Sequence, residues 1–136
     1  MKRLRFTTVL LCITFIAVVG CRGGGQIYNV KDAPIITATG KEATLNQITK
    51  AIVEAGSGLG WTMTVVKPGH IIGTLHIRSH TAIVEIPYTT KTYSILYKDS
   101  TNLKYDAQKQ TIHKNYRGWI ENLDKAIKSR LSGLGV

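Results

Sequence analysis

The sequence has very few cysteines, and their positions exclude internal disulfides. Among its 136 residues are only two cysteines, Cys12 and Cys21. Both precede residue 22, so the remaining chain has no pair of thiols that could join to one another. A domain formed by that remainder must therefore be stabilised by packing alone.

Acidic residues are also scarce, with 8 Asp and Glu against 18 Lys and Arg, for a net charge of +10. Residues 1–21 contain Lys2, Arg3 and Arg5 and no acid, so the net charge from Arg22 onward is +7. Such an excess favours contact with anionic lipid head groups or polyanionic glycans, although a solvated basic surface is the simpler interpretation. With 43% apolar and 19% charged residues, the chain is typical of one globular domain rather than a disordered one.

A long apolar run is missing as well. Residues 9–19 are apolar or nearly so, but a helix needs about 20 such residues to cross a bilayer. The run follows a cationic start and precedes the small residue Gly20, which is the layout of a secretory signal. We therefore expect a cleaved signal peptide over residues 1–20 rather than a transmembrane span.

Val18-Val19-Gly20-Cys21 resembles the bacterial lipobox. The resemblance implies thioether lipidation of Cys21, cleavage before it and acylation of the new amino terminus. A chance cysteine at an ordinary cleavage site, or an uncleaved anchor, is the alternative. Arg22 in place of aspartate implies sorting to the outer membrane, on its periplasmic face, where nucleic acid is not a partner.

Residues 22–26 contain Gly23-Gly24-Gly25 and show no apolar pattern, and residues 21–32 are predicted to form a flexible tether. A single domain over residues 33–136 follows. Pro34 begins a short β-prone stretch to residue 38, which would be an edge strand. Thr44 and Gln47 have the spacing of a capping box and predict a helix over residues 44–55.

Four apolar-alternating runs follow, separated by short turns that leave no room for crossover helices. They cover residues 61–66, 71–77, 81–86 and 92–98. From Ile112 to Leu131 apolar residues recur at spacings of three and four, which indicates an amphipathic helix. The expected fold is α+β, a two-layer sandwich in which a four-stranded antiparallel meander is flanked by an N-terminal and a C-terminal helix.

Residues 44–131 resemble a family of small, uncharacterised proteobacterial lipoproteins. The resemblance rests on these residues: Ala51, Ile52, Gly60, Trp61, Pro68, Gly69, His70, Arg78, His80, Tyr97, Lys98, Asp99, Ser100, Asn102, Leu103, Ile112, His113, Tyr116, Trp119 and Ile120. It implies the domain boundaries and no activity, cofactor or partner.

The search for chemistry gives little. His76 and His80 on one extended strand would lie ~13 Å apart, too far to bind one metal ion. Ser100, His113 and Asp99 could form a nucleophilic triad on paper, but residues 99–102 are better explained as a polar turn. No cofactor is expected.

The outward face of the predicted sheet is the more specific feature. It would present an apolar strip with a basic rim, made of Val66, Ile72, His76, Arg78, Ile83 and Leu96. Scattered apolar residues on a solvated face are the simpler interpretation. The sequence thus favours a membrane-anchored, non-enzymatic binding or assembly module of the cell envelope. The alternative is a periplasmic enzyme or enzyme inhibitor that acts through the polar sheet face or the 99–102 loop.

Overall fold

A computed structural model describes residues 24–135 of the chain. The signal peptide expected over residues 1–20 and the lipidation expected at Cys21 lie outside the described residues. The elements are β1 Gly25–Gln26, β2 Val30–Pro34, α1 Leu45–Gly58, β3 Trp61–Lys67, β4 His70–Ile77, β5 His80–Pro87, β6 Thr92–Thr101, β7 Thr111–Ile112 and α2 Asn115–Ser132.

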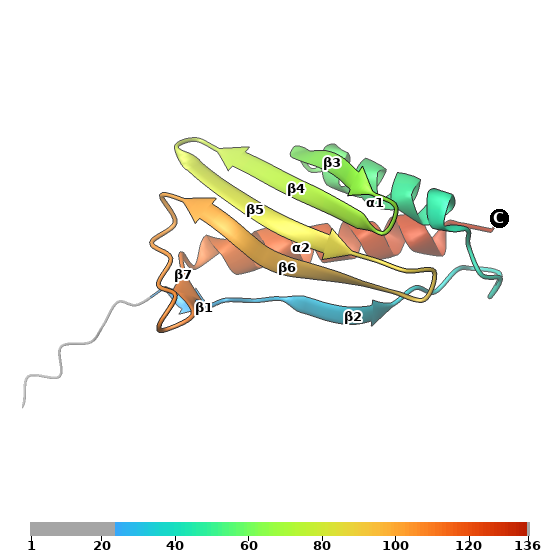
Figure 1. Cartoon of the computed structure of the whole chain (residues 1–136), viewed down its shortest axis with the longest axis horizontal. Coiled ribbons are helices and arrows are strands. Elements are labelled where there is room, and N and C mark those ends of the chain that lie inside the picture. The colour runs from blue at the N-terminus through green and yellow to red at the C-terminus, as the bar shows by residue number, and fades with distance from the viewer. Residues whose placement is uncertain (1–23, 136) are drawn as a thin grey trace, which may run out of the picture.

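The fold is α+β, as the sequence predicts. Five antiparallel strands form one open sheet in the order β2-β6-β5-β4-β3, and β1 and β7 form a second, two-stranded sheet. Both helices lie on the same side of the larger sheet (Figure 1). The other face of that sheet is covered by no element of the described chain, and this uncovered face is called the outer face below.

Helix α1 begins where the capping box predicts. The Thr44 Oγ1 atom accepts a hydrogen bond from the Gln47 amide, and Gln47 Oε1 accepts one from the Thr44 amide. The helix continues three residues beyond the predicted end, to Gly58. Gly56 lies against Met63, where a Cβ atom would be 2.3 Å from the Met63 sulfur. The chain turns out of the helix at Gly60, with φ 87°.

The core lies between the helices and the inner face of the sheet. Helix α2 buries the residues that the spacing identifies, among them Ile120, Leu123, Ile127 and Leu131. They meet Val84, Ile86, Ile95 and the other inward residues of the strands. The buried face of α2 also contains Asp124, whose partners are a tyrosine and a lysine.

The flexible tether predicted through Asp32 is wrong from Gly25 onward. Gly25 pairs with Ile112 in β1–β7, and Val30 pairs with Ile95 in β2–β6. These pairings join segments more than 60 residues apart in the sequence. They satisfy backbone hydrogen-bonding groups, and no local sequence pattern predicts them. The folded domain therefore begins before residue 33.

The edge strand predicted over residues 34–38 is also displaced. The strand β2 ends at Pro34 instead of beginning there. It does lie at an edge of the sheet, where the missing amide hydrogen of proline is tolerated. Beyond it Ile36 is 69% exposed, whereas Ile35 packs against the core, and neither residue belongs to a strand.

Candidate functional site

Three of the six residues predicted for a binding surface lie together at the centre of the outer face. Ile72 on β4 and Leu96 on β6 both lie beside Glu85 of β5, which is paired with each of them. Ile83, two residues before Glu85, pairs with Thr74. Ile72, Ile83 and Leu96 are each partly buried although no element covers them, because neighbouring side chains shield them.

A charged cluster interrupts this apolar group. Glu85 Oε1 accepts a 2.5 Å hydrogen bond from Lys98 Nζ, and the His70 Nε2 atom lies 3.9 Å from the same oxygen. The hydrogen bond from Lys98 lowers the pKa of Glu85 below its usual value, so the carboxyl stays ionised at neutral pH. The outer face is thus amphipathic, with aliphatic side chains on both sides of one ion pair.

The other three predicted residues lie away from this centre, and one of them lies outside the sheet. Val66 is 54% exposed near the turn that ends β3, beside the irregular pairing between Val65 and Lys67. His76 lies toward the opposite end of β4, where its Nδ1 atom is 3.0 Å from Thr81 Oγ1. Arg78 is not on a strand at all but in the turn between β4 and β5.

The polar residues 99–102 do not assemble a catalytic group. Asp99 to Thr101 belong to strand β6 rather than to a turn. Ser100 Oγ is 2.9 Å from the Tyr97 hydroxyl, and Asp99 Oδ1 accepts a hydrogen bond from the Ser100 amide. His113 Nδ1 accepts from the Asn115 amide. These side chains are therefore used in local structure, and no hydrogen bond links Ser100 to His113 among the described residues.

The histidines form one pair. His80 at the start of β5 and His113 before α2 have ring centroids 5.9 Å apart. His80 Nδ1 lies 2.7 Å from the carbonyl oxygen of Asn102, which assigns it the proton donor role at that nitrogen. Within residues 24–135, no three His, Cys, Asp or Glu side chains lie close enough to hold a metal ion.

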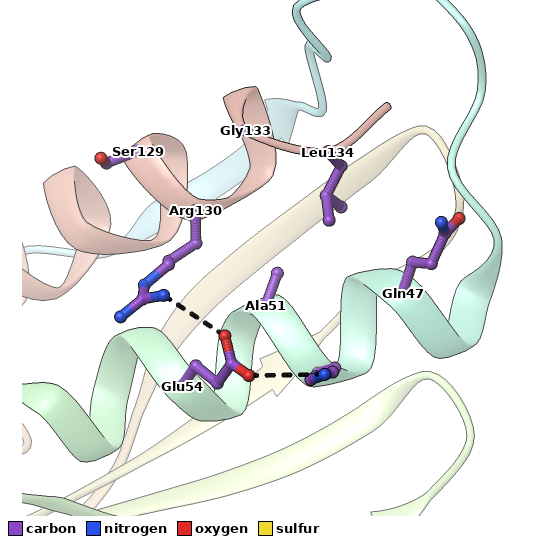
Figure 2. A pocket seen from close by; sticks show the side chains of 8 residues that line it. Gln47, Ala51, Glu54, Ser129, Arg130, Gly133 and Leu134 are labelled. Carbon is purple, nitrogen blue, oxygen red and sulfur yellow. Dashed lines mark hydrogen bonds and ion pairs between the residues drawn. The ribbon is translucent and has the colours of Figure 1, made fainter. Parts of the chain in front are cut away.

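A hollow between the two helices was not anticipated from the sequence. It has a volume of about 440 Å³ and lies between α1 and the last turns of α2. Figure 2 shows Arg130 and Glu54 pointing toward one another across it, joined at 3.4 Å, while Ala51 and Gly133 leave the space between the helices open. The sequence feature that could have indicated this hollow is small residues at the positions where the two helices face one another.

The hollow is weak as a binding site because the side chains of Lys50, Glu54 and Arg130 that line it are well exposed and partner one another. None of the described side chains in it is a buried polar group without a partner. Surface ion pairs of this kind contribute little to stability and are easily screened by salt. The outer face of the sheet therefore remains the better candidate.

In the part of the chain that the structure describes, no helix has the length and apolar character needed to cross a membrane. Comparison with protein families, with curated proteins and with solved structures finds no match for this chain.

Proposed function

We propose that the chain is the precursor of a lipoprotein of the bacterial cell envelope, anchored by acyl chains on Cys21 at the periplasmic face of the outer membrane. The support is the short apolar run, the Val18-Val19-Gly20-Cys21 lipobox and the resemblance to small proteobacterial lipoproteins. Two or three acyl chains make release from a bilayer negligible, since each buried methylene contributes about 0.8 kcal/mol.

The anchor has a direct test in the mass of the native product. Mature protein isolated from bacterial membranes should begin at Cys21 and have the added mass of its acyl chains, and the Cys21→Ser variant should keep its leader. A bare thiol at position 21, or an intact leader on the unmodified chain, would remove the proposal.

Within that setting, the domain acts as a non-enzymatic binding or assembly module whose docking surface is the outer face of the sheet. One observation supports this role: Ile72, Ile83 and Leu96 lie together on a face that no described element covers. Protein interfaces bury aliphatic side chains together with a small number of hydrogen-bonded polar groups, and here the polar group is the Glu85–Lys98 ion pair. The partner is another envelope protein that supplies an apolar patch with a matching polar group.

Two substitutions on this face test the role. Ile83→Lys and Leu96→Lys place a new charge at the centre of the patch and should abolish crosslinking of the full-length protein to its partner in intact cells. Asn122→Lys makes the same charge change at an exposed position of α2, on the other side of the domain, and should leave crosslinking intact. Equal crosslinking by all three variants, each still folded, would rule out the outer face as the docking surface.

A further inference from the structure

The pairing of β1 with β7 fixes the point at which the chain enters the domain. Gly24 packs so closely on β7 that a Cβ atom there would be 2.0 Å from the carbonyl oxygen of Ile112. Cys21 is three residues before Gly24, so at most ~11 Å of chain separates the two. An anchor on Cys21 would therefore hold this end of the domain, and no other, within about 11 Å of its attachment point.

Several loops meet at the same end. The His113 amide donates to the carbonyl oxygen of Leu103, and Asn102 Nδ2 donates to Ser79 Oγ at 2.9 Å. Together with the contact between His80 and the Asn102 carbonyl, these bonds join the β4–β5 turn, the loop after β6 and the start of α2. These segments lie side by side at the end of the domain in Figure 1 where the described chain begins.

The surface at this end is basic and has one exposed aromatic ring. Arg78, Lys104 and Lys114 are exposed, and none of them is in an ion pair with another described residue. The first turn of α2 contains no acidic residue, so its positive helix end is not neutralised by its own sequence. Tyr105, next to Lys104, is 39% exposed. We call Arg78, Lys104, Tyr105 and Lys114 the basic end.

Backbone strain collects at the same place. Five described non-glycine residues have a positive φ, and four of them are Arg78, Asn102, Lys104 and Gln110. Arg78 lies in the two-residue turn between Ile77 and His80, a site that usually takes glycine or asparagine. Strained residues of this kind cluster at functional sites. Two of the three free cations are thus presented from backbone positions that glycine would fit better.

We infer that the basic end docks on anionic phospholipid head groups, so that the strands and helices stand away from the bilayer. The inference rests on the proposed lipidation of Cys21, which places this end at the membrane surface. Lys and Arg side chains are attracted by anionic lipid, and tyrosine favours the interface between head groups and acyl chains. The outer face of the sheet then faces sideways into the periplasm, where a partner can reach it.

Depth labelling of the full-length lipoprotein tests the orientation. The mature chain has no thiol other than Cys21, so a single new cysteine can be labelled alone. Ala107→Cys puts a fluorophore in the loop of the basic end, and Pro68→Cys puts one in the β3–β4 turn at the far end. In phosphatidylglycerol vesicles with a quencher on the lipid head group, the label at 107 should lose its fluorescence and the label at 68 should keep it.

Equal quenching at the two positions, or stronger quenching at 68, would overturn the inference while the mass of the same preparation still supports the lipid anchor. A mass that shows Cys21 without acyl chains would overturn both proposals. A difference in quenching between positions 107 and 68 that appears in native membranes but not in pure lipid vesicles would assign the basic end to a protein partner. That result would likewise overturn the inference.

The contribution of charge has its own matched control. Arg78→Gly, Lys104→Gly and Lys114→Gln remove the free cations, and the two glycines suit the positive φ at their sites. Each cation removed should weaken docking on phosphatidylglycerol about fivefold. Lys41→Gln and Lys67→Gln, exposed and near the far end, should leave the quenching at 107 unchanged. Quenching that responds equally to both sets would contradict the inference.

Discussion

The hydroxyl of Tyr93 donates a 2.5 Å hydrogen bond to Oδ1 of Asp124, and this buried bond joins strand β6 to helix α2. Lys128, one turn further along the helix, donates to the second oxygen of the same carboxylate at 2.7 Å. A carboxylate buried to this extent is tolerated only when its charge is compensated and its lone pairs accept hydrogen bonds. The link therefore sets how α2 sits on the sheet, in addition to the apolar contacts around it.

Tyr93→Phe should destabilise the domain by about 1–3 kcal/mol, because it removes a donor and leaves a buried carboxylate oxygen without a partner. Urea denaturation followed by tryptophan fluorescence measures this as a lower midpoint with an unchanged m-value. A midpoint equal to that of the parent protein would contradict the structural role given to this bond.

Tyr116→Phe should have the opposite sign. The Tyr116 hydroxyl is buried and has no hydrogen-bond partner, in a ring cluster with Tyr97 and Tyr105. Removing an unsatisfied buried hydroxyl without changing the ring should raise the free energy of unfolding, by up to about 1–2 kcal/mol. Comparing Tyr116→Phe with Tyr93→Phe separates the effect of an unsatisfied hydroxyl from that of a satisfied one. A loss of stability in both variants would contradict the finding that the Tyr116 hydroxyl has no partner.

The same tyrosines predict alkaline instability. Burial raises the pKa of Tyr93 and of Tyr116 far above the ordinary value of about 10, and the bond to Asp124 raises that of Tyr93 further. Above pH ~10 the unfolded chain loses these protons while the folded chain keeps them, so the free energy of unfolding should fall by up to about 1.4 kcal/mol per pH unit for each group. Below pH ~10 these groups should contribute no pH dependence.

Urea midpoints between pH 8 and 11 test this expectation. The variant with both Tyr93→Phe and Tyr116→Phe should show a shallower decline than the parent protein over the alkaline half of that range. Identical slopes in the two proteins would show that other groups cause the alkaline loss.

Gly24→Ala and Gly25→Ala form a matched pair at the entrance of the chain. A Cβ at Gly24 would collide with the Ile112 carbonyl, whereas one at Gly25 would meet nothing within 4 Å. Gly24→Ala should therefore separate β1 from β7 and expose the Ile27 amide, which is bonded to the Gln110 carbonyl. Hydrogen exchange should show faster exchange at Ile27 in Gly24→Ala alone, and equal rates in the two variants would contradict the close packing.

Arg78→Gly should be neutral or stabilising by up to about 1 kcal/mol, since Arg78 has φ 55° and a side chain there is strained. Arg78→Ala removes the same charge but keeps the Cβ, so it should not share the gain. Thermal denaturation of both variants compares them directly. A lower melting temperature for Arg78→Gly than for Arg78→Ala would show that the arginine makes contacts that outweigh its backbone strain.

The elements that follow a local rule were predictable from the sequence. Helix α1 has its capping residues Thr44 and Gln47 in place, and α2 has its apolar residues at regular spacing. Strand β2 follows no such rule, because Val30 and Ala33 are its only buried residues and a bulge lies between them. Its position depends on β6, whose sequence is more than 60 residues away, so only the tertiary structure reveals it.

The candidate surface was predictable in part for a related reason. Alternation along β4, β5 and β6 assigns Ile72, Ile83 and Leu96 to the same face, and the register then places them together. The alternation of apolar and polar residues does not show where a strand ends. For this reason it predicts Arg78 on the sheet, although Arg78 lies in a turn. The basic end was missed entirely because its residues come from three loops that only the folded chain brings into contact.

If the chain is exported as proposed, the pairing of β1 with β7 also constrains the order of folding events. A chain that crosses a membrane amino end first delivers Gly25 long before Ile112, its partner. The two-stranded sheet cannot close until almost the whole polypeptide has emerged, and contacts between such distant segments form slowly. A lipoprotein built this way would be tethered while its amino-terminal strands still await their partners, so chaperones of the exported space would meet it already attached to the surface where it works.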